Sequence, residues 1–117
     1  MKRNYTDYLN DILDAALKAE QFVAGLGFEE FEKNDEKVFA VVRALEIIGE
    51  AARSIPDDMQ EKYTEVPWRD VIGMRDKLIH GYFGVSLKRV WDTVEGDLPR
   101  LRETILKMLA EMTTDEE

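Results

Sequence analysis

The chain has 117 residues, the usual size of a single domain and enough to bury a hydrophobic core. It contains no cysteine, which excludes disulfides and thiolate metal sites, and its net charge of −9 argues against a general nucleic-acid binder. No apolar run approaches the roughly 20 residues needed to cross a bilayer, and the first residues do not resemble a signal peptide. We therefore expect a cytoplasmic protein with no membrane partner.

Apolar residues recur at helical spacing along nearly the whole chain, without sustained strand alternation. The first stripe predicts a helix over residues 5–17 that ends near Gly25. Phe28 and Phe31 fit a short helical turn after it. The opening third of the chain is therefore expected to be helical.

The middle of the chain predicts a second long helix. Asp35 is expected to cap it, and its apolar face extends from Val38 to Ala52. Pro56 should stop it, and the polar segment 57–65 is expected to be a short helix or a loop.

Two further helices follow. Pro67 fits the first turn of a helix that runs from Trp68 to about His80, and glycines 81 and 84 permit its exit. Ser86 can cap a long final helix, which Pro99 should interrupt or kink because proline has no backbone donor.

These elements predict an all-α, up-and-down bundle of four or five helices. Residues 1–112 are expected to form one domain, and the acidic residues 113–117 a frayed tail. No repeat or low-complexity tract divides the chain.

Positive charge is concentrated in one segment. Residues 66–91 carry five basic and two acidic side chains, whereas the rest of the chain is acidic. The single histidine, His80, lies within this segment. The distribution favours a local anionic ligand over binding along a duplex, and the acidic remainder equally suits a basic partner protein.

Four residues of this segment can form a site for phosphate chemistry. Imidazole suits proton transfer near neutral pH, and arginine is the side chain best shaped to hold a phosphate. Arg75 and His80 are about 140° apart on an ideal helix, so they need the helix end or a second subunit to converge. Asp76 shares a face with His80, and Tyr82 follows the expected helix end. Taken without context, such residues more often have surface or packing roles.

The run Arg75-x4-His80-x-Tyr82 resembles the signature of the HEPN superfamily of all-α ribonuclease domains, and more narrowly that of HepT-type toxins. The similarity covers most of the chain. The flanking matches are Tyr8–Ile12, Arg43–Ala51, Pro67-Trp68, Gly73–Tyr82, Val90-Trp91 and Asp97–Pro99.

This resemblance implies a metal-independent endoribonuclease that acts as a homodimer, with two signature runs facing one cleft and no cofactor. It also implies a minimal nucleotidyltransferase antitoxin that transfers AMP to Tyr82. We assign His80 as general base or acid and Arg75 as the clamp on developing negative charge. Asp76 would position His80 or the arginine, and Tyr82 would contact RNA. No metal-ligand spacing surrounds His80.

Other polar residues can be interpreted in two ways. Arg43, Glu46 and Glu50 form one stripe, which is either a solvated ion-pair face or a set of supporting and antitoxin contacts. Gly49 on the same helix is expected to allow close helix approach, despite its propensity cost.

Lys77, Lys88 and Arg89 can hold RNA phosphates, although a solvated face explains them nearly as well. Trp68 and Trp91 are expected to be core or interface anchors rather than platforms for bases. The alternative function is a non-catalytic helical module that complexes with a nucleotidyltransferase or binds nucleotides, and the net acidity of the chain favours it.

Overall fold

The computed structural model describes the backbone of residues 4–80 and 86–116, and the side chains of residues 4–79 and 86–112. This part of the chain is helical and contains no strand, so the all-α prediction is confirmed. The elements are α1 (Tyr5–Val23), α2 (Phe28–Glu32), α3 (Asp35–Arg53), α4 (Asp57–Lys62), α5 (Trp68–His80), α6 (Leu87–Asp92), the π-helical segment η2 (Thr93–Asp97) and α7 (Leu98–Glu116).

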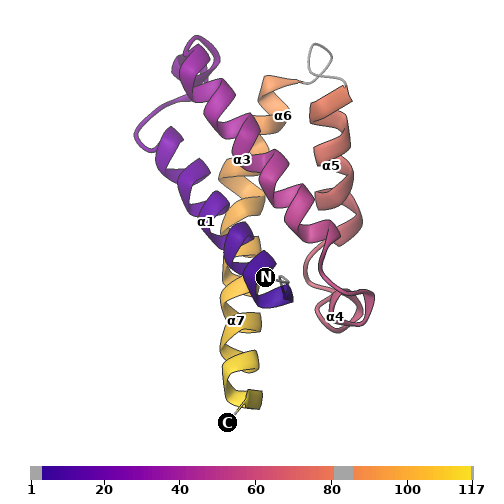
Figure 1. Cartoon of the computed structure of the whole chain (residues 1–117). Helices are drawn as coiled ribbons and strands as arrows, with labels where there is room; N and C mark the ends of the chain where they lie inside the picture. Colours follow the sequence, from indigo (N-terminus) through magenta and orange to yellow (C-terminus); the bar gives the residue numbers. More distant parts are fainter. Residues whose placement is uncertain (1–3, 81–85, 117) are drawn as a thin grey trace.

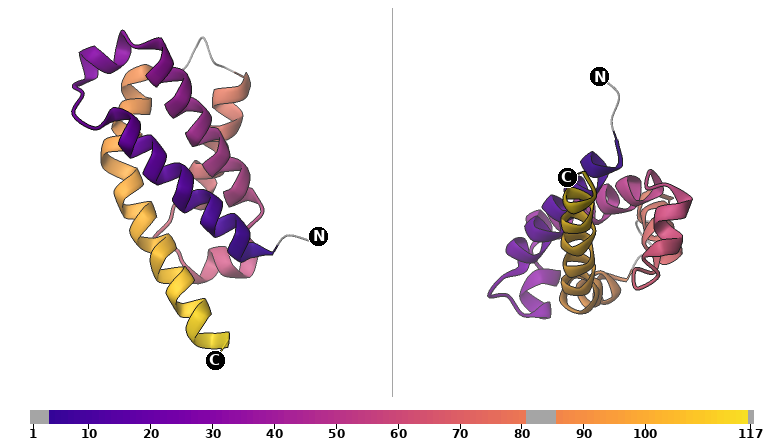
Figure 2. Two further views of the ribbon diagram at one scale, coloured as in Figure 1. Left: turned by 60° about the vertical axis from the view of Figure 1, so that its left-hand side comes forward. Right: turned by 90° about the horizontal axis from the view of Figure 1, so that it is seen from below.

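The bundle is organised around α3. Figure 1 shows α3 between α1 and α5, and Figure 2 shows α7 running beside α1. The principal contact of α5 is with α3, so α5 stands at the edge of the bundle. The side chains that are almost completely buried come mainly from α1, α3 and α7; they include Leu9, Ile12, Leu45, Ile48, Ile105 and Met108.

Local sequence signals place most helix starts. The side chain of Asn4 accepts a hydrogen bond from the Asp7 amide and that of Ser86 accepts one from the Arg89 amide, as N-caps do. The expected cap at Asp35 is wrong by one residue: Asn34 is the cap, because its side-chain oxygen accepts from the Lys37 amide.

The last helix is interrupted where Pro99 predicted it. A π-helical turn, η2, precedes α7, and the Leu98 amide donates to the carbonyl of Thr93, five residues earlier. Proline has no N–H for the carbonyl four residues before it, so the wider turn relieves the mismatch. The C-terminal end differs from expectation, because α7 stays helical to Glu116 instead of fraying from Thr113. No glycine or proline follows Pro99 to end it.

Both tryptophans are packing residues, as expected. The Trp68 side chain is buried, and its indole Nε1–H donates to the Tyr63 carbonyl at 3.0 Å, which fixes the start of α5. The Trp91 ring contacts those of Phe28 and Phe31, with centroids 6.1 and 5.4 Å apart. No helix in the described part of the chain is long and apolar enough to span a membrane.

Candidate functional site

The backbones of α3 and α5 approach each other closely at Gly49. A Cβ atom at this position would overlap the Cβ of Arg75 and would lie 3.2 Å from both the Arg75 Cγ and the Val71 carbonyl oxygen. The prediction that Gly49 allows close helix approach is therefore confirmed. Its absent side chain lets the stem of Arg75 lie directly against α3, although Arg75 belongs to α5.

The guanidinium group of Arg75 is held by two carboxylates. Its Nη1 lies 3.1 Å from Asp76 Oδ1, and its Nη2 lies 3.5 Å from Glu50 Oε1 on α3. The side chain remains 27% exposed, while its Nε is buried and has no hydrogen-bond partner among the described residues. Arg75 is thus oriented from both helices but still reaches solvent.

Asp76 joins two arginines. Its Oδ1 accepts from Arg75, and its Oδ2 accepts from Nη2 of Arg53 at 2.9 Å. Of the two expected roles for Asp76, these contacts favour positioning the arginine. Arg53 was missed by the sequence analysis. Its only signal was its spacing of three and four residues from Glu50 and Gly49, which places it on the face of α3 that meets α5.

We call Glu50, Arg53, Arg75 and Asp76 the α3–α5 charge cluster. The hydrogen bond to Asp76 raises the pKa of Arg75, and the Glu50 hydrogen bond and charge raise it further against desolvation. The hydrogen bond from Arg75 lowers the pKa of Asp76, and Arg53 adds to this effect. The cluster contains two basic and two acidic side chains, so its formal net charge is zero.

His80 is the last residue of α5, five residues after Arg75 and about 7.5 Å further along the helix axis. Its side chain lies outside the described part of the structure, as do Tyr82 and the expected glycine exit at residues 81 and 84. The described residues therefore place the arginine half of the signature, and the roles of His80 and Tyr82 stay predictions.

The stripe of polar residues on α3 divides into two parts. Glu50 contacts Arg75, whereas Arg43 and Glu46 pair with each other, with 3.2 Å between Arg43 Nη1 and Glu46 Oε2. Arg43 and Glu46 thus form an ion pair, while Glu50 contacts the arginine of the signature, and the supporting or antitoxin-binding role of all three stays a prediction.

The three other candidate cations are exposed. Lys88 pairs with Asp92 at 3.1 Å and lies 5.3 Å from the centroid of the Phe28 ring. Lys88 and Arg89 belong to α6, and Lys77 to α5. No described contact joins these cations to the charge cluster.

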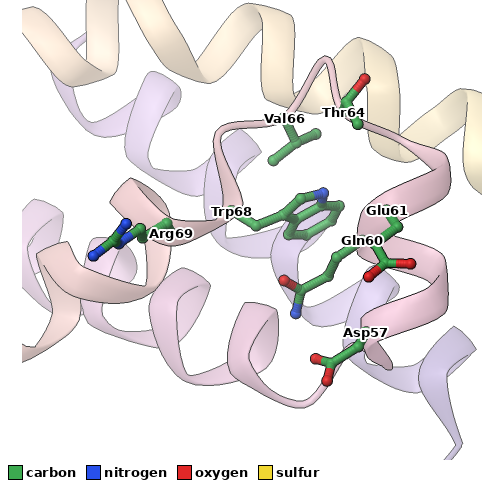
Figure 3. A pocket seen from close by; sticks show the side chains of 7 residues that line it. All are labelled: Asp57, Gln60, Glu61, Thr64, Val66, Trp68 and Arg69. Atoms are coloured by element: carbon green, nitrogen blue, oxygen red, sulfur yellow. The ribbon is translucent and has the colours of Figure 1, made fainter.

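An open pocket lies near the beginning of α5 (Figure 3). It is lined by Asp57, Gln60, Glu61, Thr64, Val66, Trp68 and Arg69. None of the predicted site residues line it, and the Gln60 amide donates to the backbone carbonyls of Ala52 and Ile55. This pocket is therefore separate from the candidate site. No group of three acidic, histidine or cysteine side chains suited to a metal occurs among the described residues.

The all-α bundle is the fold of a HEPN-type domain. A family model described as Ribonuclease HepT-like matches residues 12–108. The chain belongs to this HepT-like ribonuclease family.

Relatives support the same assignment over nearly their full length. A protein of Thermococcus cleftensis named "Probable ribonuclease HepT" is 47% identical over 108 residues, which cover 92% of this chain and 98% of the relative. "Putative RNase MJ1216" of Methanocaldococcus jannaschii is 40% identical over 116 residues, which cover 99% and 96% of the two chains. No solved structure matches this chain.

Proposed function

We propose that this protein is the toxin of a toxin–antitoxin system and cleaves RNA as a metal-independent endoribonuclease in the cytoplasm. One observation carries the proposal. The chain belongs to a ribonuclease family, and two carboxylates hold Arg75, which lies on the helix that ends at His80. This arrangement supports a role for Arg75 as the clamp on phosphate, because two carboxylates orient its guanidinium group.

The reaction needs proton movement and charge stabilisation. The 2′-hydroxyl of RNA attacks the adjacent phosphorus while His80 accepts its proton. The bond from phosphorus to the 5′-oxygen breaks, leaving a 2′,3′-cyclic phosphate, and the departing oxygen takes a proton from His80 of the partner subunit. Arg75 stabilises the negative charge that develops on the phosphoryl oxygens.

The proposed homodimer places two such sites in one cleft. Support comes from α5, which stands at the edge of the bundle and has several apolar side chains that are only partly covered. Val71, Ile72 and Met74 are half-buried, and Ile79 is 40% exposed. A two-fold partner on this face would cover them and bring the second His80 towards the first Arg75.

The proposed partner is a minimal nucleotidyltransferase antitoxin. Its transfer of AMP from ATP to the phenolic oxygen of Tyr82 releases pyrophosphate and adds bulk and negative charge next to His80. The acidic surface implied by a net charge of −9 suits a basic partner protein.

A non-catalytic binding module is the second candidate. The zero net charge of the α3–α5 charge cluster and the acidity of the whole chain favour it, because RNA binding draws on excess positive charge.

One experiment separates the two. Wild type and His80→Ala are expressed with and without the antitoxin, and growth and cleavage of RNA by the purified proteins are measured, with EDTA in a parallel reaction. We expect only the wild type to arrest growth and cleave RNA, with EDTA making no difference. Equal cleavage by both variants would refute the role of His80, and loss of cleavage in EDTA would refute metal independence.

A further inference from the structure

The α3–α5 charge cluster contains two arginines, and Arg53 is the one that lies outside the signature. It is the last residue of α3, and its Nη2 lies 2.9 Å from Asp76 Oδ2. Its side chain is 54% exposed, twice the exposed fraction of Arg75. We propose that Arg53 binds an RNA phosphate next to the one held by Arg75. The proposal rests on RNA being the substrate, as proposed above.

The shared carboxylate brings the two guanidinium groups together. Each Asp76 carboxylate oxygen accepts a hydrogen bond from one arginine, so Arg53 and Arg75 flank Asp76 although they come from different helices. A guanidinium group has five N–H donors, and the bond to Asp76 uses one of those of Arg53. Most of its donors therefore remain available to a ligand from solvent.

Arg53 brings the net charge of the α3–α5 charge cluster to zero. Arg75 alone faces two carboxylates, Glu50 and Asp76, and those three groups would carry a net charge of −1. Such a group would repel a phosphate diester. Arg53 cancels this excess charge. Among the contacts of Arg75, the one to Glu50 is the longer at 3.5 Å, so an RNA oxygen can compete for that donor more readily than for the one on Asp76.

The proposed role of Arg53 is in binding and not in proton transfer. Arg53 ends α3, next to α4, and its guanidinium group reaches Asp76, four residues before His80 (Figure 1). It is proposed to hold the phosphate next to the reacting one, so it makes no contact with the atoms that His80 protonates or deprotonates. Losing this contact should weaken RNA binding and raise KM, while kcat stays within about two-fold.

Salt dependence of binding tests the proposal directly. A fluorescent single-stranded RNA oligonucleotide is titrated with His80→Ala protein, which does not cleave it, at several salt concentrations. The same titration is done with Arg53→Ala, Arg53→Lys or Lys18→Ala added. Lys18 is a matched control because it is 57% exposed and pairs with Asp14 on α1, on the other side of α3.

We expect Arg53→Ala to raise the Kd several-fold and to reduce the slope of log Kd against log salt by about 0.7, the value for one phosphate on a single strand. Arg53→Lys should keep the slope because it keeps the charge, but its Kd should rise because lysine lacks the arginine fork. If circular dichroism shows that Arg53→Ala does not fold, the rise in the Kd of Arg53→Lys serves as the test. Lys18→Ala should change neither quantity.

Three outcomes would contradict the proposal. An unchanged Kd and slope for Arg53→Ala would overturn it, as would an equal change for Lys18→Ala. A lower kcat with an unchanged slope would assign Arg53 to positioning Asp76 instead. Each of these requires that the parent protein binds RNA. Failure of the parent to bind RNA would instead overturn the proposed function, and this inference with it.

Discussion

Gly49 of α3 lies directly against Arg75 of α5, with no room for a side chain between them. This contact sets the separation of the two helices at the point where Glu50 and Asp76 reach the guanidinium group. A packing feature of the core-facing helix thereby fixes the direction of the charged side chain proposed to hold RNA.

Gly49→Ala is expected to destabilise the fold. Its new Cβ would collide with Arg75, and overpacking costs about 1–3 kcal/mol, partly offset by about 1 kcal/mol of improved helix propensity. Gly73→Ala in α5 is the matched control, because a Cβ there meets nothing within 4 Å, and it should stabilise by up to about 1 kcal/mol. Urea denaturation measures both. Equal changes in the free energy of unfolding for the two substitutions would show that the close approach of α3 and α5 at Gly49 does not limit the size of the side chain there.

Arg75→Lys should slow RNA cleavage although it keeps the charge. Lysine cannot offer a planar fork to a phosphate while also contacting Asp76 and Glu50. We expect kcat to fall by about 10²-fold, in the range seen when one donor to a transition-state oxyanion is lost. Arg69→Lys, at an exposed arginine near the start of α5, should leave kcat unchanged. Full activity of Arg75→Lys would exclude the clamp.

Glu50→Gln should tighten RNA binding. Removing this carboxylate gives the α3–α5 charge cluster a net charge of +1 and frees the donor that Glu50 occupies on Arg75. We expect the Kd for single-stranded RNA to fall several-fold, in the opposite direction to Arg53→Ala. Glu46→Gln, which loses only the pair with Arg43, is the control. Weaker binding by Glu50→Gln would indicate that Glu50 is needed to orient Arg75.

Asp76 should link the stability of the fold to acid pH. Its pKa is lowered below the ordinary value of 3.8, chiefly by the hydrogen bond from Arg75. Its stabilising contribution is therefore complete above about pH 4 and is lost as pH falls through the lowered pKa. The urea midpoint of the wild type should exceed that of Asp76→Asn by a constant amount between about pH 5 and 8, and the difference should disappear in stronger acid. A difference that grows as pH falls from neutrality would contradict this assignment.

Tyr82→Phe should keep RNA cleavage but lose inhibition by the antitoxin. Phenylalanine keeps the ring for RNA contact but has no oxygen to accept AMP. We expect the variant to cleave RNA within a few-fold of the wild-type rate and to gain no AMP when incubated with the antitoxin and ATP, as measured by intact-protein mass spectrometry. Addition of AMP to this variant would place the modification at another residue.

Short-range signals determined much of the fold. Helical periodicity, the cap at Ser86 and the interruption before Pro99 depend on residues within a few positions of one another, so the sequence predicts them. The predicted N-cap of α3 is wrong by one residue, Asp35 instead of Asn34, because both side chains can cap a helix.

By itself, the sequence determined an all-α chain, the helix that carries Arg75 and His80, and the need for a small residue at Gly49. The tertiary structure alone decided that Glu50 and Arg53, 25 and 23 residues away from their partners, meet Arg75 and Asp76. Those contacts depend on how α3 packs on α5, and no local pattern encodes that packing, because the periodicity marks which face of each helix is buried but not which residues of the two faces meet.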